Sequence, residues 1–448
     1  MSGSSGPDAG AERHAVVVDP YSGAVDYAHA FHARGVPVIA VLSTPAPLDV
    51  FAAAWQPEEF DAVHVYDGDF AALAAYLRAA RPLCVLPGNE TAVELAEALV
   101  DELLPGTGNT PGGSAARRDK WLMAQALAAA GVPHVRQVCA TDPETVAAWV
   151  RDNGLAERRL VLKPPKSGGT DSVHVTDAGG DWRPYFDRIN GAVNRFGFRN
   201  AGVLVQEYVE GTEYIVDTYS VDGRHVLTEV ARYVKRRRGE RLGLYAHTDF
   251  VAHDDPCVPV LADYVAQVAD ALGIRNGAAH GEVMMTADGP RLIEIGARLA
   301  GTPLQHASRE ATGDCQIDRA VRHHVDGARP DAYTLRRHVR IISLSVERAG
   351  VLRGAAALDA IRDLPTVSAV SLPHRDGETV PATVDLFTLL GWVVLASADA
   401  QAIRADHERI REIERSVVVE PTGEPSGRTD RDQSRSANDR VPTSRGNT

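Results

Sequence analysis

The residue best placed for phosphate chemistry is a lysine that ends a predicted strand and precedes a glycine loop. Lys163 closes the apolar run 160–163, and residues 164–172 then hold two glycines and three hydroxyl side chains. Glycines let backbone N–H groups approach an anion closely, hydroxyls donate hydrogen bonds, and lysine supplies positive charge. The loop is therefore predicted to bind phosphate groups, although a solvated polar turn would have the same composition. The predicted contacts are Ser167, Gly168, Gly169, Thr170 and Ser172.

Two glutamates in neighbouring predicted strands form a second candidate group. The turn Asp288-Gly289 between Glu282 and Glu294 favours a hairpin, which would make the two glutamates cross-strand neighbours on one face. Adjacent carboxylates repel each other, so the pair calls for a cation. Mg²⁺ prefers carboxylates together with phosphates. The alternative for either glutamate alone is a surface ion pair with Arg298.

An acidic segment follows another predicted strand. The apolar run 203–205 leads into residues 206–213, which include three glutamates. A kinked segment of this kind can bind adenine through backbone groups and ribose through a carboxylate, whereas a strand that simply ends in a turn is the alternative. The predicted nucleotide contacts are Glu207, Tyr208, Val209 and Glu213.

These groups follow one another in a characteristic order. The order is Lys120, Lys163 with its loop, Glu207-x-Val209, Glu282, and Glu294-x-x-x-Arg298. In this respect the sequence resembles the ATP-grasp superfamily over about residues 15–330. Within the superfamily it looks most like the L-amino acid ligases, which are dipeptide synthetases. That likeness rests on Arg118-Asp119-Lys120-x-x-Met123, on the segment 292–301, and on a third lobe from Arg336 to about Val419.

The resemblance implies an ATP-dependent carboxylate–amine ligase that uses Mg²⁺, for which Mn²⁺ would also serve. The implied substrates are a small-molecule carboxylate and an amine, both amino acids, joined through an acyl phosphate with release of ADP and phosphate. Lys120 and Lys163 would hold the phosphates, and Glu282 and Glu294 would bind the metal. Arg298 and His247 are the implied catalytic residues. The candidate substrate contacts are Glu90, Tyr245, Gly301 and Thr302.

One position departs from the family pattern. Gly296 stands where many ATP-grasp enzymes have an asparagine, and water could replace the lost metal ligand. Two alternatives therefore stay open: a nucleotide-binding module without catalysis, and a ligase for a non-amino-acid carboxylate or a peptide. A biotin-carboxylase role is disfavoured because the chain carries no Met-Lys-Met site. The basic run 235–241 is interpreted as a solvated hairpin tip, with a substrate-contacting loop as the alternative.

The elements that must position these residues are predicted from hydrophobic periodicity. Strands alternate with helices over residues 13–112, which predicts a parallel α/β sheet. Residues 113–335 are predicted to form the ATP-grasp domain, with a helix over 114–130 and a small β-rich lid lobe at about 133–208. Residues 336–420 would add an α+β lobe, so the predicted fold class is multidomain α/β and α+β. The polar ends, 1–12 and 421–448, are predicted to be disordered.

Composition excludes several other classes of protein. The 448-residue chain has 47 Lys and Arg against 60 Asp and Glu, a formal net charge of −13, which disfavours binding to nucleic acid or to an anionic membrane. Its apolar runs are far shorter than the roughly 20 residues that span a bilayer. The four cysteines include no C-x-x-C pair, so neither a disulfide framework nor a zinc site is indicated. We expect a cytoplasmic enzyme, with a homodimer as the commonest assembly.

Overall fold

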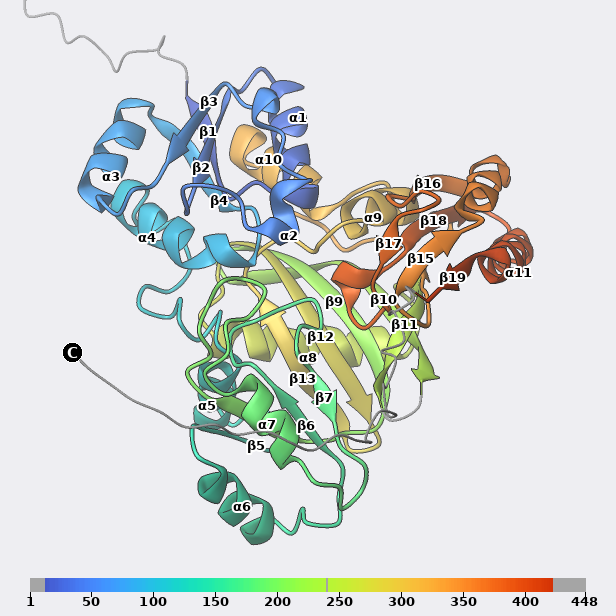
Figure 1. Cartoon of the computed structure of the whole chain (residues 1–448). Coiled ribbons are helices and arrows are strands. Elements are labelled where there is room, and N and C mark those ends of the chain that lie inside the picture. Colours follow the sequence, from blue (N-terminus) through green and yellow to red (C-terminus); the bar gives the residue numbers. More distant parts are fainter. Residues whose placement is uncertain (1–12, 239–240, 422–448) are drawn as a thin grey trace, which may run out of the picture.

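The computed structural model describes residues 13–238 and 241–421, which are arranged in four parts (Figure 1). Residues from all four parts line one cleft. We refer to these parts by their predicted ranges as the N-terminal domain (13–112), the lid lobe (133–208) and the C-terminal lobe (336–420), together with a central sheet. The N-terminal sheet is parallel and the sheets that follow are antiparallel. The predicted multidomain α/β and α+β fold is confirmed.

Three segments that carried predictions lie outside the described residues. They are the two ends predicted to be disordered, 1–12 and 422–448, and the tip of the basic hairpin, 239–240. Within the described part of the chain, no helix is both long and apolar enough to cross a membrane.

Four parallel strands build the sheet of the N-terminal domain, in the order β3-β2-β1-β4. Helix α10, from much later in the chain, packs beside α1 through Phe31, Ile317 and Val321 (Figure 1). Segments that follow β1 and β4 line the cleft, as expected for the carboxyl ends of an open sheet. The elements are β1 (His14–Val18), η1 (Ser22–Val25), α1 (Asp26–His32), β2 (Val38–Leu42), α2 (Asp49–Ala52), η2 (Pro57–Glu59), β3 (Ala62–Val65), α3 (Phe70–Ala79), β4 (Pro82–Pro87), η3 (Glu90–Ala92), α4 (Val93–Leu103) and α10 (Gln316–Asp326).

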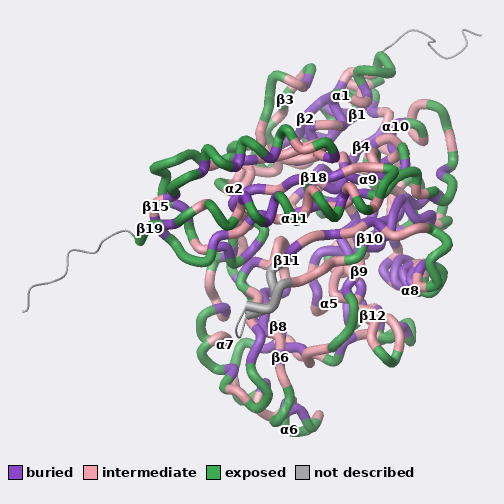
Figure 2. Tube along the Cα trace, turned by 90° about the vertical axis from the view of Figure 1, so that its right-hand side faces the viewer, coloured by how far each residue is buried: buried purple, intermediate pink, exposed green. Residues whose placement is uncertain are grey.

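The lid lobe is a four-stranded antiparallel sheet in the order β5-β8-β6-β7. Its small core includes Val146, Leu162, Phe186 and Val205, so two short helices cover the sheet. Helix α6 lies at the end farthest from the N-terminal domain (Figure 1), and it buries Val146 and Val150 against the lobe while its two ends are exposed (Figure 2). The elements are β5 (Gln137–Ala140), α6 (Pro143–Asp152), β6 (Leu160–Lys163), β7 (His174–Val175), α7 (Arg183–Ile189) and β8 (Val203–Glu207).

The central sheet has eight strands in the order β13-β12-β9-β10-β11-β14-β18-β16. Strand β14 pairs with β11, so the strands of the C-terminal lobe continue this sheet. Alternating residues of β9 point to opposite faces: Val216 packs with α8, and Ile215 belongs to the cluster under α9. The elements are α5 (Lys120–Ala129), β9 (Thr212–Val221), β10 (Arg224–Arg238), β11 (Arg241–Phe250), α8 (Cys257–Ala271), β12 (Gly277–Thr286), β13 (Gly289–Gly296), α9 (Leu304–Thr312), β14 (His338–Leu344), β16 (Val367–Ser371) and β18 (Gly391–Ser397).

The C-terminal lobe adds a three-stranded sheet, β17-β15-β19, and the long helix α11. Its core joins Ile342 and Val393 of the central sheet to Leu352 and Ile410. The elements are β15 (Gly350–Arg353), η4 (Ala355–Asp363), β17 (Thr379–Val380), η5 (Leu386–Thr388), α11 (Ala400–Ser416) and β19 (Val418–Glu420).

Helix α5 begins later than predicted. The helix expected over 114–130 starts at Lys120, because Asp119 is extended and caps it by accepting a hydrogen bond from the backbone N–H of Trp121 (2.9 Å). Residues 114–118 form turns instead. In these turns the buried Arg117 donates to the Glu97 carboxylate and to the carbonyl oxygen of Leu272.

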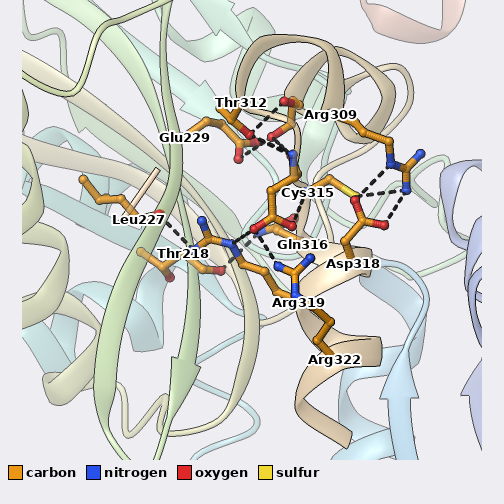
Figure 3. A network of polar contacts seen from close by, with 12 residues as sticks. Thr218, Leu227, Glu229, Arg309, Thr312, Cys315, Gln316, Asp318, Arg319 and Arg322 are labelled. Atoms are coloured by element: carbon orange, nitrogen blue, oxygen red, sulfur yellow. Dashed lines mark hydrogen bonds and ion pairs between the residues drawn. The ribbon is translucent and has the colours of Figure 1, made fainter. Parts of the chain in front are cut away.

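Buried polar side chains tie α9 and α10 to the central sheet (Figure 3). Arg319 donates to the carbonyl oxygen of Leu227 (3.0 Å), and Ser308 donates to the carboxylate of Glu229 (2.9 Å). Gln316 donates to two carbonyl groups of the sheet, at 3.0 and 3.2 Å. These contacts hold both helices against the central sheet, and α9 directly follows the segment that runs from β13 along the cleft.

Candidate active site

One cleft of about 1230 Å³ lies where the four parts of the molecule meet. It is lined by all but two of the residues predicted to form the site. The two exceptions are Ser172 and His247. The groups predicted from distant parts of the sequence therefore face a common space.

The two predicted phosphate lysines reach the cleft from different elements. Lys163 ends β6 in the lid lobe, and Lys120 begins α5. The Nζ atom of Lys120 lies 2.9 Å from Glu294 and also donates to the carbonyl oxygen of Ser167. Burial, reinforced by the Lys120 charge, lowers the pKa of Lys163 to about 8. A phosphate group bound here would form charge-assisted hydrogen bonds with both lysine side chains.

The two predicted metal ligands are directly opposite each other. Glu282 of β12 pairs with Glu294 of β13, which confirms the hairpin expected around Gly289. Tyr233 donates to Glu282 (3.2 Å), and the Nε2 atom of His280 lies 3.8 Å from the same carboxylate. Burial alone would raise the pKa of Glu282, but the hydrogen bond and charge of His280 lower it. Glu282 is therefore held as a carboxylate.

This donor set fits a hard divalent cation. The described residues contain no group of three or more His, Cys, Asp and Glu side chains suited to a metal ion. Two opposed carboxylates can bind Mg²⁺, because this ion keeps several waters and takes substrate phosphates as its other ligands. Glu282 and Glu294 would hold it beside the lysines, where it would offset phosphate charge.

An ion-paired group joins the N-terminal domain to the segment after β13. Glu90 follows β4 and accepts a hydrogen bond from Nε of Arg298 (2.6 Å), while its other oxygen pairs with Arg118. Burial would raise the pKa of Glu90, but the charges of Arg118 and Arg298 lower it to about 2. Nε and Nη2 of buried Arg118 have no hydrogen-bond partner among the described residues. The group thus presents cationic donors on both sides of one carboxylate.

The glycine loop is organised by an aspartate that the sequence did not single out. Asp171 accepts hydrogen bonds from Ser167 (2.8 Å), Ser172 (3.0 Å) and the backbone N–H of Arg195 (3.0 Å). Ser172 is therefore turned toward Asp171 and away from the cleft, contrary to prediction. Gly169 has a φ of +67°, and a Cβ there would lie 2.5 Å from the ring of Phe387.

The predicted nucleotide segment lines the cleft with its backbone at the end of β8. The Glu207 carboxylate points to Arg136, which donates to it at 2.6 Å, and the Tyr208 ring lies 4.0 Å from the guanidinium of Arg159. Both side chains are thus engaged by arginines of the lid lobe. Gln206, which was not predicted, presents a buried amide beside the cleft. An amide can donate to and accept from a base edge.

Glu213 and Tyr245 belong to one buried group. Tyr245 donates to Glu213 (3.4 Å), and its ring contacts that of Tyr233 in a tilted arrangement with ring centres 4.1 Å apart. The Nζ atom of Lys235 lies over the Tyr245 ring. Burial raises the pKa of Glu213, although its ion pair with Lys235 opposes this. The two residues contact each other as well as the cleft.

His247 is not where the resemblance implied. Strand β11 carries a register shift opposite Val234, and beyond it Thr248, not His247, lines the cleft. The Nε2 atom of His247 lies 3.5 Å from Asp249, and its ring contacts that of His407 in α11. The structure therefore places His247 against the C-terminal lobe and outside the lining of the cleft, contrary to the predicted position.

The substrate candidates Gly301 and Thr302 follow Arg298 on the way to α9. The hydroxyl of Thr302 lies 2.9 Å from that of Ser22, so this segment meets the N-terminal domain at the cleft. Gln316, missed by sequence reasoning, accepts from the backbone N–H of Ala300 (2.9 Å). As an isolated glutamine in a helix it gave no sequence signal.

A glycine loop that faces two lysines, opposed glutamates and an arginine across one cleft defines the ATP-grasp class of enzymes. Comparison with known proteins agrees. Residues 157–305 match the ATP-grasp domain family. Dapdiamide A synthase from Enterobacter agglomerans is 31% identical over 416 residues, which cover 89% of this chain and 95% of that protein. The chain therefore belongs to the ATP-grasp family, and it is a ligase of the kind that forms a carbon–nitrogen bond and releases ADP.

Other similar proteins share parts of the sequence or the fold. Carnosine synthase 1 from Mus musculus is 31% identical over 158 residues, 32% of this chain and 18% of that protein. The crystal structure of an L-amino acid ligase from Bacillus licheniformis has a TM-score of 0.69 at 15% identity, covering 92% of this chain and all of that one. Carboxyaminoimidazole ribonucleotide synthase from Aspergillus clavatus, solved with ATP, has a TM-score of 0.67 at 12% identity, covering 90% and 99%. These structural likenesses describe the fold.

Proposed function

We propose that the enzyme joins two amino acids through an amide bond and activates one carboxylate as an acyl phosphate. The observation that carries this proposal is the Glu90–Arg298 pair in the cleft that also holds the lysines and the opposed glutamates. A zwitterionic amino acid needs an anion for its ammonium group and a cation for its carboxylate, and this pair offers both. The names of the similar L-amino acid ligase and dapdiamide A synthase support the same class of substrates.

In the first step, a carboxylate oxygen of one substrate attacks the γ-phosphorus of ATP. The bond from that phosphorus to the β–γ bridging oxygen breaks, and ADP leaves with the electron pair. Lys120 and Lys163 would hold the phosphate oxygens by charge-assisted hydrogen bonds. Mg²⁺ bound by Glu282 and Glu294 would neutralise part of the phosphate charge.

In the second step, the neutral amine of the other substrate attacks the acyl carbon. The tetrahedral oxyanion collapses, phosphate leaves with the carbon–oxygen electron pair, and the nitrogen loses one proton. Arg298 would stabilise the oxyanion with a donor already in place. The loop 167–172 would close over the phosphates and keep water from the acyl phosphate.

Nucleotide products test this mechanism directly. We would incubate the protein with Mg²⁺-ATP and pooled amino acids and measure ADP, AMP and phosphate. Amino-acid-dependent release of ADP and phosphate is expected, whereas AMP and pyrophosphate would contradict an acyl phosphate.

A variant links the activity to the opposed glutamates. Glu294→Ala is expected to lower turnover by about 100-fold or more, because it removes one of two metal ligands. Glu408→Ala, in an exposed position of α11, is the matched control. Unchanged turnover in Glu294→Ala would overturn the metal assignment.

A further inference from the structure

The C-terminal lobe lines part of the cleft, although no residue of this lobe was predicted to form the site. It contributes two serines, one aspartate and otherwise apolar side chains. The apolar residues are Ile341, Val384, Leu386, Phe387, Leu389 and Trp392. The path from Arg298 to this wall runs through Thr302 and Leu304, and Leu304 belongs to the same apolar cluster as Ile341 and Trp392.

Trp392 is the largest of these side chains, and its neighbours across the sheet are small. It pairs with Ser343 of β14 on one side and Ser371 of β16 on the other, and all three residues line the cleft. Because a serine occupies each neighbouring position, no large side chain from these two positions covers the indole. Trp392 therefore offers an apolar surface to whatever enters this part of the cleft.

This wall offers no free charge to a ligand. Asp385 is the single ionisable residue that the described C-terminal lobe contributes to the cleft, and its carboxylate pairs with Arg195 at 2.8 Å. It also accepts from the backbone N–H of Phe387 (3.1 Å). On the N-terminal domain, Tyr21 and Phe51 stack with ring centres 5.5 Å apart and line the same cleft. A charged group placed between these walls would lose hydration without gaining a partner.

We infer that this apolar compartment, formed by the C-terminal lobe around Trp392, binds the side chain of one of the two amino-acid substrates, and that the preferred side chain is bulky and apolar. The inference rests on the proposed function, because it takes Glu90 and Arg298 as the contacts of the ammonium and carboxylate groups. The side chain then extends past Thr302 toward Trp392. Its burial there removes apolar surface from water, which favours branched and aromatic side chains over small or charged ones.

Paired substrate assays test the inference. We would measure ADP release with alanine plus each of glycine, valine, leucine, phenylalanine, lysine and glutamate, and identify the products by mass spectrometry. Wild type is expected to favour leucine or phenylalanine over glycine by at least about 10-fold in kcat/KM. Trp392→Ala is expected to raise KM for leucine and phenylalanine by about 10-fold with little change in kcat, and to leave glycine unaffected.

The controls separate a lost subsite from a damaged protein. Val418→Ala changes an exposed apolar residue of the same lobe, in β19, and should match wild type. A fall that is equal for all substrates in Trp392→Ala, or a wild type that prefers small or charged side chains, would overturn the subsite while leaving the ligase standing. If wild type releases no ADP with any pair, the proposed function fails and the inference falls with it.

Discussion

At the residue scale, Gly296 shows what an absent side chain makes room for. A Cβ at this position would lie 3.0 Å from the Glu90 carboxylate and 3.3 Å from Nε of Arg298. Both contacts are tighter than ordinary van der Waals contact, so a larger residue must displace one of the two partners. The glycine at position 296, which departs from the family pattern, therefore leaves the room that the Glu90–Arg298 pair occupies.

Replacing Gly296 with asparagine is expected to separate Arg298 from Glu90. Turnover should fall by about 100-fold, because the oxyanion donor loses its position, while ATP still binds. Steady-state kinetics with calorimetric ATP titration would separate the two effects. Gly296→Ala should show a smaller loss of the same kind. Full activity in Gly296→Asn would show that the glycine is not needed for the ion pair.

Lys163 gives the enzyme a pH dependence whose sign follows from its pKa. Because the pKa is lowered to about 8, the free enzyme holds the cation below that pH and loses it above. ATP affinity is therefore expected to fall as the pH rises through 8, by up to about tenfold per pH unit. Calorimetric titrations between about pH 7 and pH 9 measure this. Lys163→Arg stays charged and should flatten the profile; an equal slope in both proteins would assign the titration to another group.

How much of the site the sequence revealed depends on how each residue acts. Residues proposed to contact a ligand from a strand end or a glycine loop, such as Lys163 and Glu294, leave a local pattern in the sequence. Asp171 and Gln316 act by holding other residues in place, and their hydrogen-bond partners are set by the fold. His247 was predicted to lie in the site but does not line the cleft. The register shift in β11 next to it has no signature in the local sequence.

At the element scale, the lid lobe and the C-terminal lobe meet over the glycine loop. Arg195 of the lid pairs with Asp385 (2.8 Å), and the rings of Phe196 and Phe387 meet edge to face at 6.2 Å. The backbone N–H of Leu386 donates to the carbonyl oxygen of Gly169 (3.4 Å). The C-terminal lobe therefore holds the lid against the cleft.

Removing the Arg195 side chain should loosen this contact. Arg195→Ala is expected to raise KM for ATP several-fold and to make ADP release exceed amide formation, because water then reaches the acyl phosphate. The ratio of phosphate to amide product measures the leak. Arg188→Ala, at an exposed position of α7, should keep the wild-type ratio. If Arg195→Ala keeps the wild-type ratio of phosphate to amide product, the lid closes without this contact.

The elements themselves were largely predictable, and their long-range pairing was not. Hydrophobic periodicity predicted the parallel sheet of residues 13–112, and the turn Asp288-Gly289 predicted the hairpin of β12 and β13. The helix was predicted to begin at residue 114 because alanines before and after Asp119 favour a helix. The N-cap role of Asp119 was therefore not recognised. The pairing of β14 with β11 joins residues about 90 positions apart, and no local pattern encodes it.

At the scale of the whole molecule, that pairing makes the C-terminal lobe part of the catalytic core. Arg340 of β14 binds Asp249 of β11 through two hydrogen bonds of 2.6 and 2.9 Å. Val339, Ile341 and Val394 are buried in the cluster beneath α9. Because α9 follows directly from the Arg298 segment, the lobe supports the active site from behind as well as lining it.

A chain that ends at Leu335 is therefore expected to lose its fold rather than only its substrate selectivity. Burial of each of those three side chains is worth about 1.5–3 kcal/mol, together a large part of the roughly 5–15 kcal/mol that stabilises a domain, and β11 would be left as an unpaired edge. The shortened chain should be aggregated or unfolded by circular dichroism and gel filtration. A chain ending at Pro421 keeps every contact described above and should stay folded. If the chain ending at Leu335 is folded and binds ATP, the ATP-grasp domain folds independently of the C-terminal lobe. The pairing of β11 with β14 would then join two domains that each fold alone.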